Sequence, residues 1–101
     1  MKVYISGAIT NDPNYKKKFR RAEKLWEKKG VEVVNPAKNK GKNYKEYIET
    51  GIFQLMNCNT IYMLKGWEDS KGARLEHRIA EKCGYNIIYE KDNEKKRLKR
   101  L

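Results

Sequence analysis

Short apolar runs alternate along this chain with longer stretches in which apolar residues recur at helical spacing. Each of four runs rich in β-branched and aromatic residues predicts a strand, at positions 2–6, 31–34, 60–64 and 86–89. Between them, apolar or small residues share one helical face in three sets: Tyr15, Phe19, Ala22, Leu25 and Trp26; Tyr44, Tyr47, Ile48, Gly51, Ile52 and Leu55; Gly72, Ile79, Ala80 and Cys83. The pattern therefore predicts three helices, each between two strands.

Local signals predict where these helices begin and end. Asp12 and Pro13 predict the start of the first helix, because aspartate caps free N–H groups and proline fits the first helical position. Gly30 predicts its end. The third helix is expected over about residues 71–82, and the polar segment 37–43 is expected to form a loop.

Alternation of strands and helices predicts a parallel sheet built from βαβ units. We expect a single-domain α/β fold, a flavodoxin- or Rossmann-like three-layer sandwich with about four strands in the order 2-1-3-4. In that order the first and third strands end side by side, at the place where ligands bind in such sheets. The segments expected there, 6–10 and 66–70, are rich in small and polar residues that allow a ligand to approach the backbone.

The chain is strongly basic, with 24 Lys and Arg against 13 Asp and Glu among 101 residues and a formal charge of +11. This charge favours anionic partners, either small nucleotides or nonspecifically bound nucleic acid, and both remain open. The sequence carries no zinc-finger, basic-zipper or RNA-recognition signature. Residues 1–90 are expected to form the folded domain, and the basic tail 91–101 a frayed helix or a disordered segment.

Cysteine usage and hydropathy restrict the class of protein. With only Cys58 and Cys83 we expect no disulfide framework, and a reduced, cytoplasmic chain. These cysteines and the single histidine match no zinc pattern, so no metal or other cofactor is expected. The chain has no apolar run long enough to span a membrane, and its N-terminal apolar stretch is too short for a secretory signal.

One carboxylate lies where a carboxylate is costly. Glu76 falls one turn after Gly72 on the inward face of the third helix, so it is either a buried structural partner or a functional group.

Ser70, near the start of that helix, either caps it or binds phosphate. Tyr4 either hydrogen-bonds Glu76 or is an ordinary core tyrosine. Trp67 either walls a base-binding pocket or covers the sheet edge.

The turn after the first strand is a second candidate for ligand binding. Backbone N–H groups of Ser6, Gly7 and Ala8 could cradle a phosphate, or the segment could be a tight turn without a ligand. It is neither a Walker loop nor a dinucleotide fingerprint, because it lacks the Lys-Ser/Thr ending and has a single glycine.

Three longer motifs carry a family resemblance. The chain opens with Met-Lys-Val-Tyr-Ile-Ser-Gly and has Val-Val-Asn-Pro-Ala at 33–37. Residues 58–77 follow, at every fixed position except 59, the pattern Cys-Asp-x-Ile-Tyr-x-Leu-x-Gly-Trp-Glu-x-Ser-x-Gly-Ala-x-x-Glu-His. With these motifs, residues 1–90 resemble the nucleoside 2-deoxyribosyltransferase-like family, including small phage-encoded members and the related 2′-deoxynucleoside 5′-phosphate N-hydrolases.

The resemblance implies a function and a set of roles. Glu76 would be the nucleophile that attacks C1′ of the deoxyribosyl group and releases the base, and Tyr4 would orient it. Water or another base would resolve the glycosyl-enzyme ester. Relatives are homo-oligomers that often complete each other's sites, so a homo-oligomer is expected. The substrate-binding positions implied are Ser6, Gly7, Ala8, Ile9, Gly66, Trp67, Ser70 and Gly72.

One position departs from the family pattern. Asn59 replaces an aspartate that, in the family, helps to protonate or hold the base, and an amide cannot act as an acid. Asp69 is a possible substitute.

We therefore expect a protein that binds a (deoxy)nucleoside 5′-monophosphate and cleaves or exchanges its N-glycosidic bond. The alternatives are a nucleotide-binding sensor or sponge without turnover, and a basic nucleic-acid-associated protein.

Overall fold

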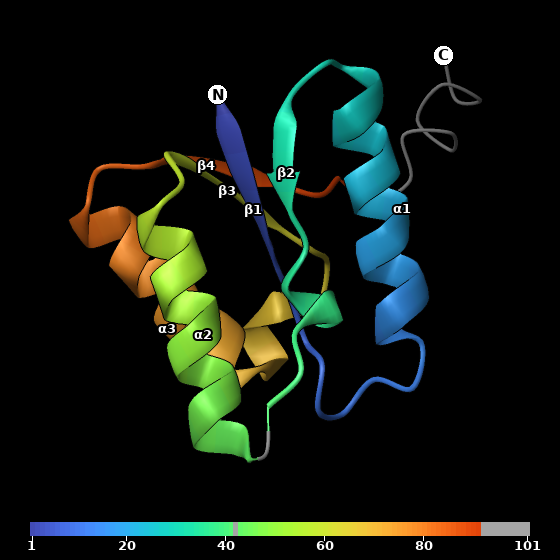
Figure 1. The fold of residues 1–101 in the computed structure, drawn as a ribbon, viewed down its shortest axis with the longest axis vertical. Coiled ribbons are helices and arrows are strands. Elements are labelled where there is room, and N and C mark those ends of the chain that lie inside the picture. Colours follow the sequence, from blue (N-terminus) through green and yellow to red (C-terminus); the bar gives the residue numbers. More distant parts are fainter. Residues whose placement is uncertain (42, 92–101) are drawn as a thin grey trace.

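The structure, a computed structural model, describes residues 1–41 and 43–91. Strands and helices alternate along these ranges as the apolar pattern predicts (Figure 1). The elements are β1 (Lys2–Ser6), α1 (Tyr15–Lys28), β2 (Glu32–Val34), the 3-10 helix η1 (Pro36–Lys38), α2 (Tyr44–Met56), β3 (Thr60–Met63), the 3-10 helix η2 (Trp67–Asp69), α3 (Lys71–Lys82) and β4 (Asn86–Tyr89). The basic tail predicted from residue 91 onward lies, from residue 92, outside the described residues.

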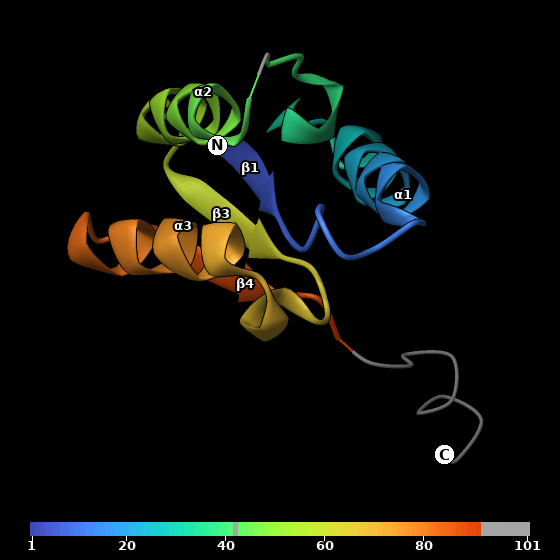
Figure 2. The ribbon, with the colours of Figure 1, turned by 90° about the horizontal axis from the view of Figure 1, so that it is seen from below.

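The four strands in the described ranges form one parallel sheet in the order β2-β1-β3-β4, which confirms the predicted order. Tyr4 of β1 pairs with Val34 of β2 on one side and with Ile61 of β3 on the other. Helix α1 covers one face of the sheet, and α2 and α3 cover the opposite face (Figure 2). The fold is therefore the predicted three-layer α/β sandwich.

Alternation along β1 assigns its side chains to the two faces of the sheet. Val3 and Ile5 pack with Phe19 and Trp26 of α1. Tyr4 packs on the opposite face, with Ile61 and Met63 of β3 and with Leu55 and Ala73 of the helices that cover that face. Residues two apart in a strand share a face, so Ser6 points to the same layer as Tyr4.

The predicted start of the first helix is wrong. Helix α1 begins at Tyr15, and Asn14 rather than Asp12 or Pro13 precedes it. The Asp12 carboxylate instead accepts a hydrogen bond from the Asn14 N–H (2.8 Å) and pairs with Lys18 Nζ (2.6 Å). This side chain therefore stabilises a turn before the helix, a conformation that competes with capping for the same residue type.

The segment expected to form a loop begins with a turn of 3-10 helix. Asn35 precedes η1 and accepts a hydrogen bond from Ala37 N (2.9 Å), while Pro36 occupies its first position. No helix in the described part of the chain is long and apolar enough to cross a membrane.

Candidate functional site

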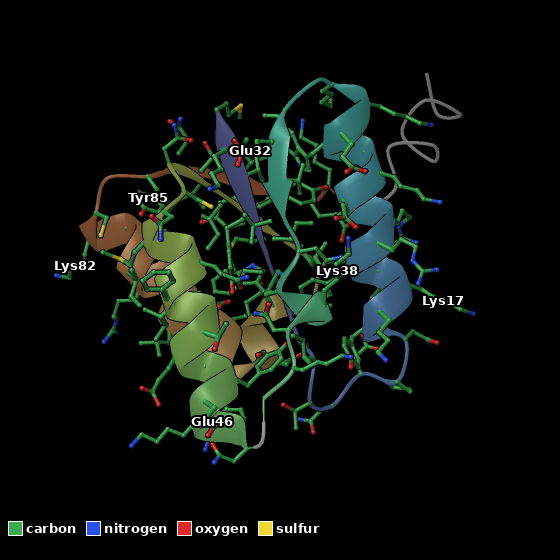
Figure 3. The ribbon with its side chains drawn as sticks, in the orientation of Figure 1. Lys17, Glu32, Lys38, Glu46, Lys82 and Tyr85 are labelled. Carbon is green, nitrogen blue, oxygen red and sulfur yellow. The ribbon has the colours of Figure 1, made fainter. Side chains whose placement is uncertain are left out.

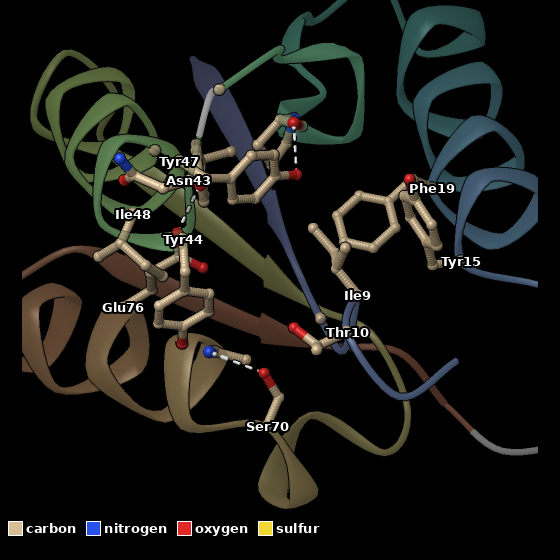
Figure 4. A pocket seen from close by; sticks show the side chains of 17 residues that line it. Ile9, Thr10, Tyr15, Phe19, Asn43, Tyr44, Tyr47, Ile48, Ser70 and Glu76 are labelled. Carbon is tan, nitrogen blue, oxygen red and sulfur yellow. Dashed lines mark hydrogen bonds between the residues drawn. The ribbon is translucent and has the colours of Figure 1, made fainter. Parts of the chain in front are cut away.

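A cavity of about 300 Å³ opens at the carboxyl end of β1, between the first turns of α1, α2 and α3 (Figure 4). This is the edge of the sheet at which the strand order predicts a ligand site. Its lining combines aromatic, small and polar residues, among them Tyr4, Tyr15, Phe19, Tyr44, Tyr47, Gly7, Ile9, Gly51, Gly72, Thr10, Asn43, Ser70 and Glu76.

Glu76 lies at the floor of this cavity and is 9% exposed. Tyr4 Oη donates a hydrogen bond to Glu76 Oε2 (2.5 Å), and Ser6 Oγ donates one to Oε1 (2.6 Å). The predicted contact between Tyr4 and Glu76 is thus confirmed. The bond from Ser6 was not predicted, because Ser6 was expected to be part of a phosphate loop. Each carboxylate oxygen is held by one hydroxyl, so the orientation of the carboxylate is fixed.

Burial and hydrogen bonding act on the Glu76 carboxyl in opposite directions. Burial raises its pKa above the ordinary value, and the bonds from Ser6 and Tyr4 lower it, with burial the larger effect. Burial and the neighbouring Glu76 charge raise the pKa of Tyr4 as well. Tyr4 therefore keeps its proton and acts as a donor.

Gly51 allows α2 to lie directly against this pair. A Cβ atom at Gly51 would lie 2.8 Å from Tyr4 Oη and 3.2 Å from Glu76 Oε2. A glycine inside a helix destabilises it by roughly 0.5–1 kcal/mol relative to alanine, so its presence indicates a packing need. Sequence reasoning placed Gly51 on the inward face of its helix but missed its place at the site.

Two helices begin at the cavity. Ser70 precedes α3 and its Oγ accepts a hydrogen bond from Ala73 N (3.2 Å), so the capping interpretation is confirmed. Asn43 caps α2 in the same way through Glu46 N (2.9 Å). Both caps line the cavity (Figure 4). Free N–H groups and the positive ends of two helix dipoles favour an anion there.

Gly72 also lines the cavity, next to the second of these helices. A Cβ atom there would lie 3.1 Å from Ile48 Cδ1 and 3.6 Å from Tyr44 Oη. Of the predicted phosphate loop, Gly7 and Ile9 line the cavity, whereas Ser6 lies below it and Ala8 does not reach it.

Aromatic side chains that were assigned to helix cores form one wall of the cavity. Tyr15 and Phe19 meet edge to face with ring centroids 6.4 Å apart. Tyr47 Oη donates to Pro36 O (2.8 Å), and burial, with smaller effects of Tyr15 and Glu76, raises the pKa of Tyr47 to about 12. Rings of this kind can stack on a planar heterocycle. Their spacing in the sequence is that of ordinary core residues, so it gave no separate signal.

Three residues of the loop before α3 do not line the cavity. Trp67 stacks on His77 with ring centroids 4.3 Å apart and lies 6.1 Å from the ring of Tyr89 on the edge strand β4. This position fits the interpretation that Trp67 covers the sheet edge. Gly66 has a φ of +88° and directly precedes η2, and Asp69 is exposed.

Asn59 lies at the amino end of the sheet, whereas the cavity lies at the carboxyl end. It directly precedes β3, and its Oδ1 accepts hydrogen bonds from Lys2 N (3.1 Å) and Thr60 Oγ1 (3.0 Å). The cavity lies at the carboxyl end of the sheet, and Asn59 does not line it. The structure does not bring Asn59 to the cavity, because a residue that precedes a parallel strand lies at the amino end of the sheet. The role expected for Asn59 at the base stays a prediction.

The described residues contain no group of three or more His, Cys, Asp or Glu side chains that could hold a metal ion. The chemistry available in the cavity is that of one carboxylate, several hydroxyls and helix N-termini.

The family described as Domain of unknown function (DUF4406) matches residues 1–89. The match covers β1 through β4 and every residue that lines the cavity. No curated protein matches the chain. The family description names no activity, so the resemblance to nucleoside 2-deoxyribosyltransferase-like proteins stays a prediction.

Proposed function

The chain belongs to the DUF4406 family, and we propose that it binds a (deoxy)nucleoside 5′-monophosphate and cleaves or exchanges its N-glycosidic bond. One observation carries the proposal. Glu76 is buried, is held by two hydroxyl donors and faces a cavity of about 300 Å³, a volume at the lower end of the range typical of small-molecule sites.

The lining of the cavity supports a place for each part of this substrate. The aromatic wall suits the base, and the starts of α2 and α3, with the Ser70 hydroxyl, suit the phosphate. The formal charge of +11 adds a general attraction for anions. The sugar then lies between these ends, above Glu76.

The reaction proceeds in two displacements. A Glu76 oxygen forms a bond to C1′ while the bond from C1′ to the base nitrogen breaks, and the electron pair leaves with the base. The base takes its proton from water, and the sugar remains as an ester of Glu76. A water oxygen then attacks C1′, loses a proton, and releases the carboxylate and the sugar phosphate. In a transfer, a second base replaces this water.

Binding without turnover is the second candidate, and one observation favours it. Glu76 is the only carboxylate among the described residues that line the cavity, so no second carboxylic acid can protonate the leaving base. Burial also favours the protonated form of Glu76, which is not a nucleophile. A sensor or sponge for a nucleotide would use the same cavity.

A panel of nucleosides and 5′-monophosphates distinguishes the two candidates. Each compound is incubated with the wild type, with Glu76→Gln, and with Glu49→Gln, which changes an exposed carboxylate of α2. Free base is measured by chromatography and ligand binding by the shift of melting temperature. Base release by the wild type and Glu49→Gln, lost in Glu76→Gln, supports the enzyme.

A melting shift without base release supports the binding protein. If no compound in the panel gives either signal, both proposals are wrong.

A further inference from the structure

We propose that the outer face of α1 binds the phosphate backbone of nucleic acid. This basic face consists of Lys17, Arg20, Arg21, Lys24 and Lys28, which, together with Leu25, line a surface groove of about 480 Å³. It lies on the side of α1 turned away from the sheet, and Lys17 points outward there (Figure 3). The inference is independent of the chemistry proposed for Glu76.

The charges of the basic face are largely uncompensated. In the described part of the chain, the ion pair found for it joins Arg21 to Glu90, at 3.9 Å. Glu23, on the same helix, forms its ion pair with Lys38 (2.8 Å) and has a weaker electrostatic interaction with Arg20. Cations held close together on one face repel one another. Phosphates bound between them would reduce this repulsion, which favours binding of a phosphate backbone.

The spacing of the cations suits a nucleic-acid strand. They fall at i, i+3, i+4, i+7 and i+11, on one face of a helix of 14 residues, which is about 21 Å long. A DNA strand carries one phosphate per about 3.4 Å of axis, so the helix spans roughly six phosphates. The residues that line the groove are five cations and one leucine, with no amide to pair with adenine and no aromatic ring to stack on a base, so we expect them to contact mainly phosphates.

A membrane surface fits this face less well. Helices that lie in a membrane interface insert an apolar face, and the apolar residues Phe19, Ala22 and Trp26 of α1 are buried against the sheet. Leu25 alone adds apolar surface to the basic face, at 44% exposure.

The sequence beyond the described residues carries further charge of the same sign. The described chain ends at Lys91, next to Glu90, which contacts Arg21. Residues 92–101 add the cations Lys95, Lys96, Arg97, Lys99 and Arg100 against Asp92 and Glu94.

Two variants that lose equal charge test the proposal. The first carries Lys17→Gln, Arg20→Gln, Lys24→Gln and Lys28→Gln, and the matched control carries Lys45→Gln, Lys71→Gln, Arg78→Gln and Lys82→Gln on α2 and α3. All eight side chains are exposed, so both variants should melt close to the wild type. Binding of a fluorescently labelled 20-base-pair DNA duplex is measured by anisotropy between 50 and 200 mM NaCl, with vesicles containing phosphatidylserine as a second probe.

We expect the wild type and the control to bind the duplex with a steep salt dependence. In the α1 variant, the slope of log K against log salt should be shallower by about 0.9 for each lost phosphate contact, and affinity at 100 mM should fall by at least about tenfold. Equal losses in both variants would mean that only net charge matters, and would overturn the assignment to α1. Absence of binding by the wild type at 50 mM, an unchanged α1 variant, or tighter binding to the vesicles than to the duplex would each overturn the proposal.

Discussion

On one side of the sheet, α1 packs Phe19 and Trp26 against Val3 and Ile5, and its charges lie outside. On the other side, α2 and α3 bury Glu76, the one carboxylate that is buried in the described ranges, and leave a cavity above it. The same sheet thus carries an apolar contact on one face and a polar site on the other. Apolar packing explains the first face, whereas the second contains an ionisable carboxyl group that apolar packing alone would exclude.

The difference also appears in what each layer exposes. The α1 layer presents cations, whereas the α2 layer presents apolar side chains, among them Phe53 at 72% exposure and Met56 at 54%. Burying a carboxylate is unfavourable unless hydrogen bonds compensate for lost water, and Tyr4 and Ser6 supply those bonds. We infer that the α2–α3 face gives up some stability to hold this carboxyl group.

Replacing Glu76 by glutamine should have the largest effect on activity, because it removes the buried carboxyl group that distinguishes the α2–α3 face from the α1 face. Base release should fall by at least about 10³-fold, since the amide cannot form the ester with C1′. The fold should persist, because the amide can still hydrogen-bond the hydroxyls of Tyr4 and Ser6. Chromatography of free base and circular dichroism check both statements, and full activity of the variant would reject the nucleophile.

The stability of this variant should depend on pH with a defined sign. Burial raises the pKa of the Glu76 carboxyl in the folded protein above its unfolded value of about 4.3. The contribution of such a group to the free energy of unfolding is fully present below its pKa in the unfolded chain. It is lost as the pH rises through its pKa in the folded protein. Glu76→Gln should therefore melt higher than the wild type at pH 8, with the difference shrinking toward pH 4, and base release by the wild type should rise with pH. A variant that melts far below the wild type at pH 8 would make Glu76 a structural partner.

Gly51→Ala should damage the α2–α3 face and leave the α1 face intact. The new methyl group would lie 2.8 Å from Tyr4 Oη, so Tyr4 or α2 must move. Overpacking of this kind costs about 1–3 kcal/mol, only partly offset by the roughly 0.5–1 kcal/mol that alanine adds to helix stability. We expect a lower melting temperature and weaker base release.

Thr50→Ala, one position earlier on the exposed side of α2, is the matched control. If Gly51→Ala were as stable and active as this control, the close approach of α2 to Tyr4 would not constrain the site.

Two substitutions at Ser70 separate its two roles at the cavity. Ser70→Ala removes both the helix cap and the hydroxyl. Ser70→Gly removes the hydroxyl but should lower the free energy of unfolding by only about a few tenths of a kcal/mol, since glycine is accepted at N-caps. A hydrogen bond to a charged group contributes roughly 1.5–3 kcal/mol, so both variants should bind a nucleoside 5′-monophosphate about 10- to 150-fold more weakly. The nucleoside should lose little affinity, as measured by calorimetry. Equal weakening of both ligands would limit Ser70 to capping.

The fold followed from the sequence because two periodicities specify it. Alternation along β1 separates Val3 and Ile5 from Tyr4, and helical spacing places Glu76 inward. The same alternation could have predicted that Ser6 joins Tyr4 at the carboxylate. The aromatic wall could not be predicted, since a tyrosine facing a cavity and one facing a core have the same spacing. The start of α1 was missed because Asp12 stabilises a turn as readily as it caps a helix.

Asn59→Asp should have the smallest effect on stability and activity, because Asn59 takes part neither in the α1 packing nor in the cavity. Its side chain accepts hydrogen bonds from Lys2 N and Thr60 Oγ1 at the amino edge of the sheet, and an aspartate can accept both. The new charge would be exposed to solvent, so melting should change little. Base release should stay within about twofold of the wild type, whereas a general acid at the base would raise it by about 10²–10⁴-fold. An increase of that size would mean that Asn59 reaches the base after all, and that the amino edge of the sheet takes part in the site.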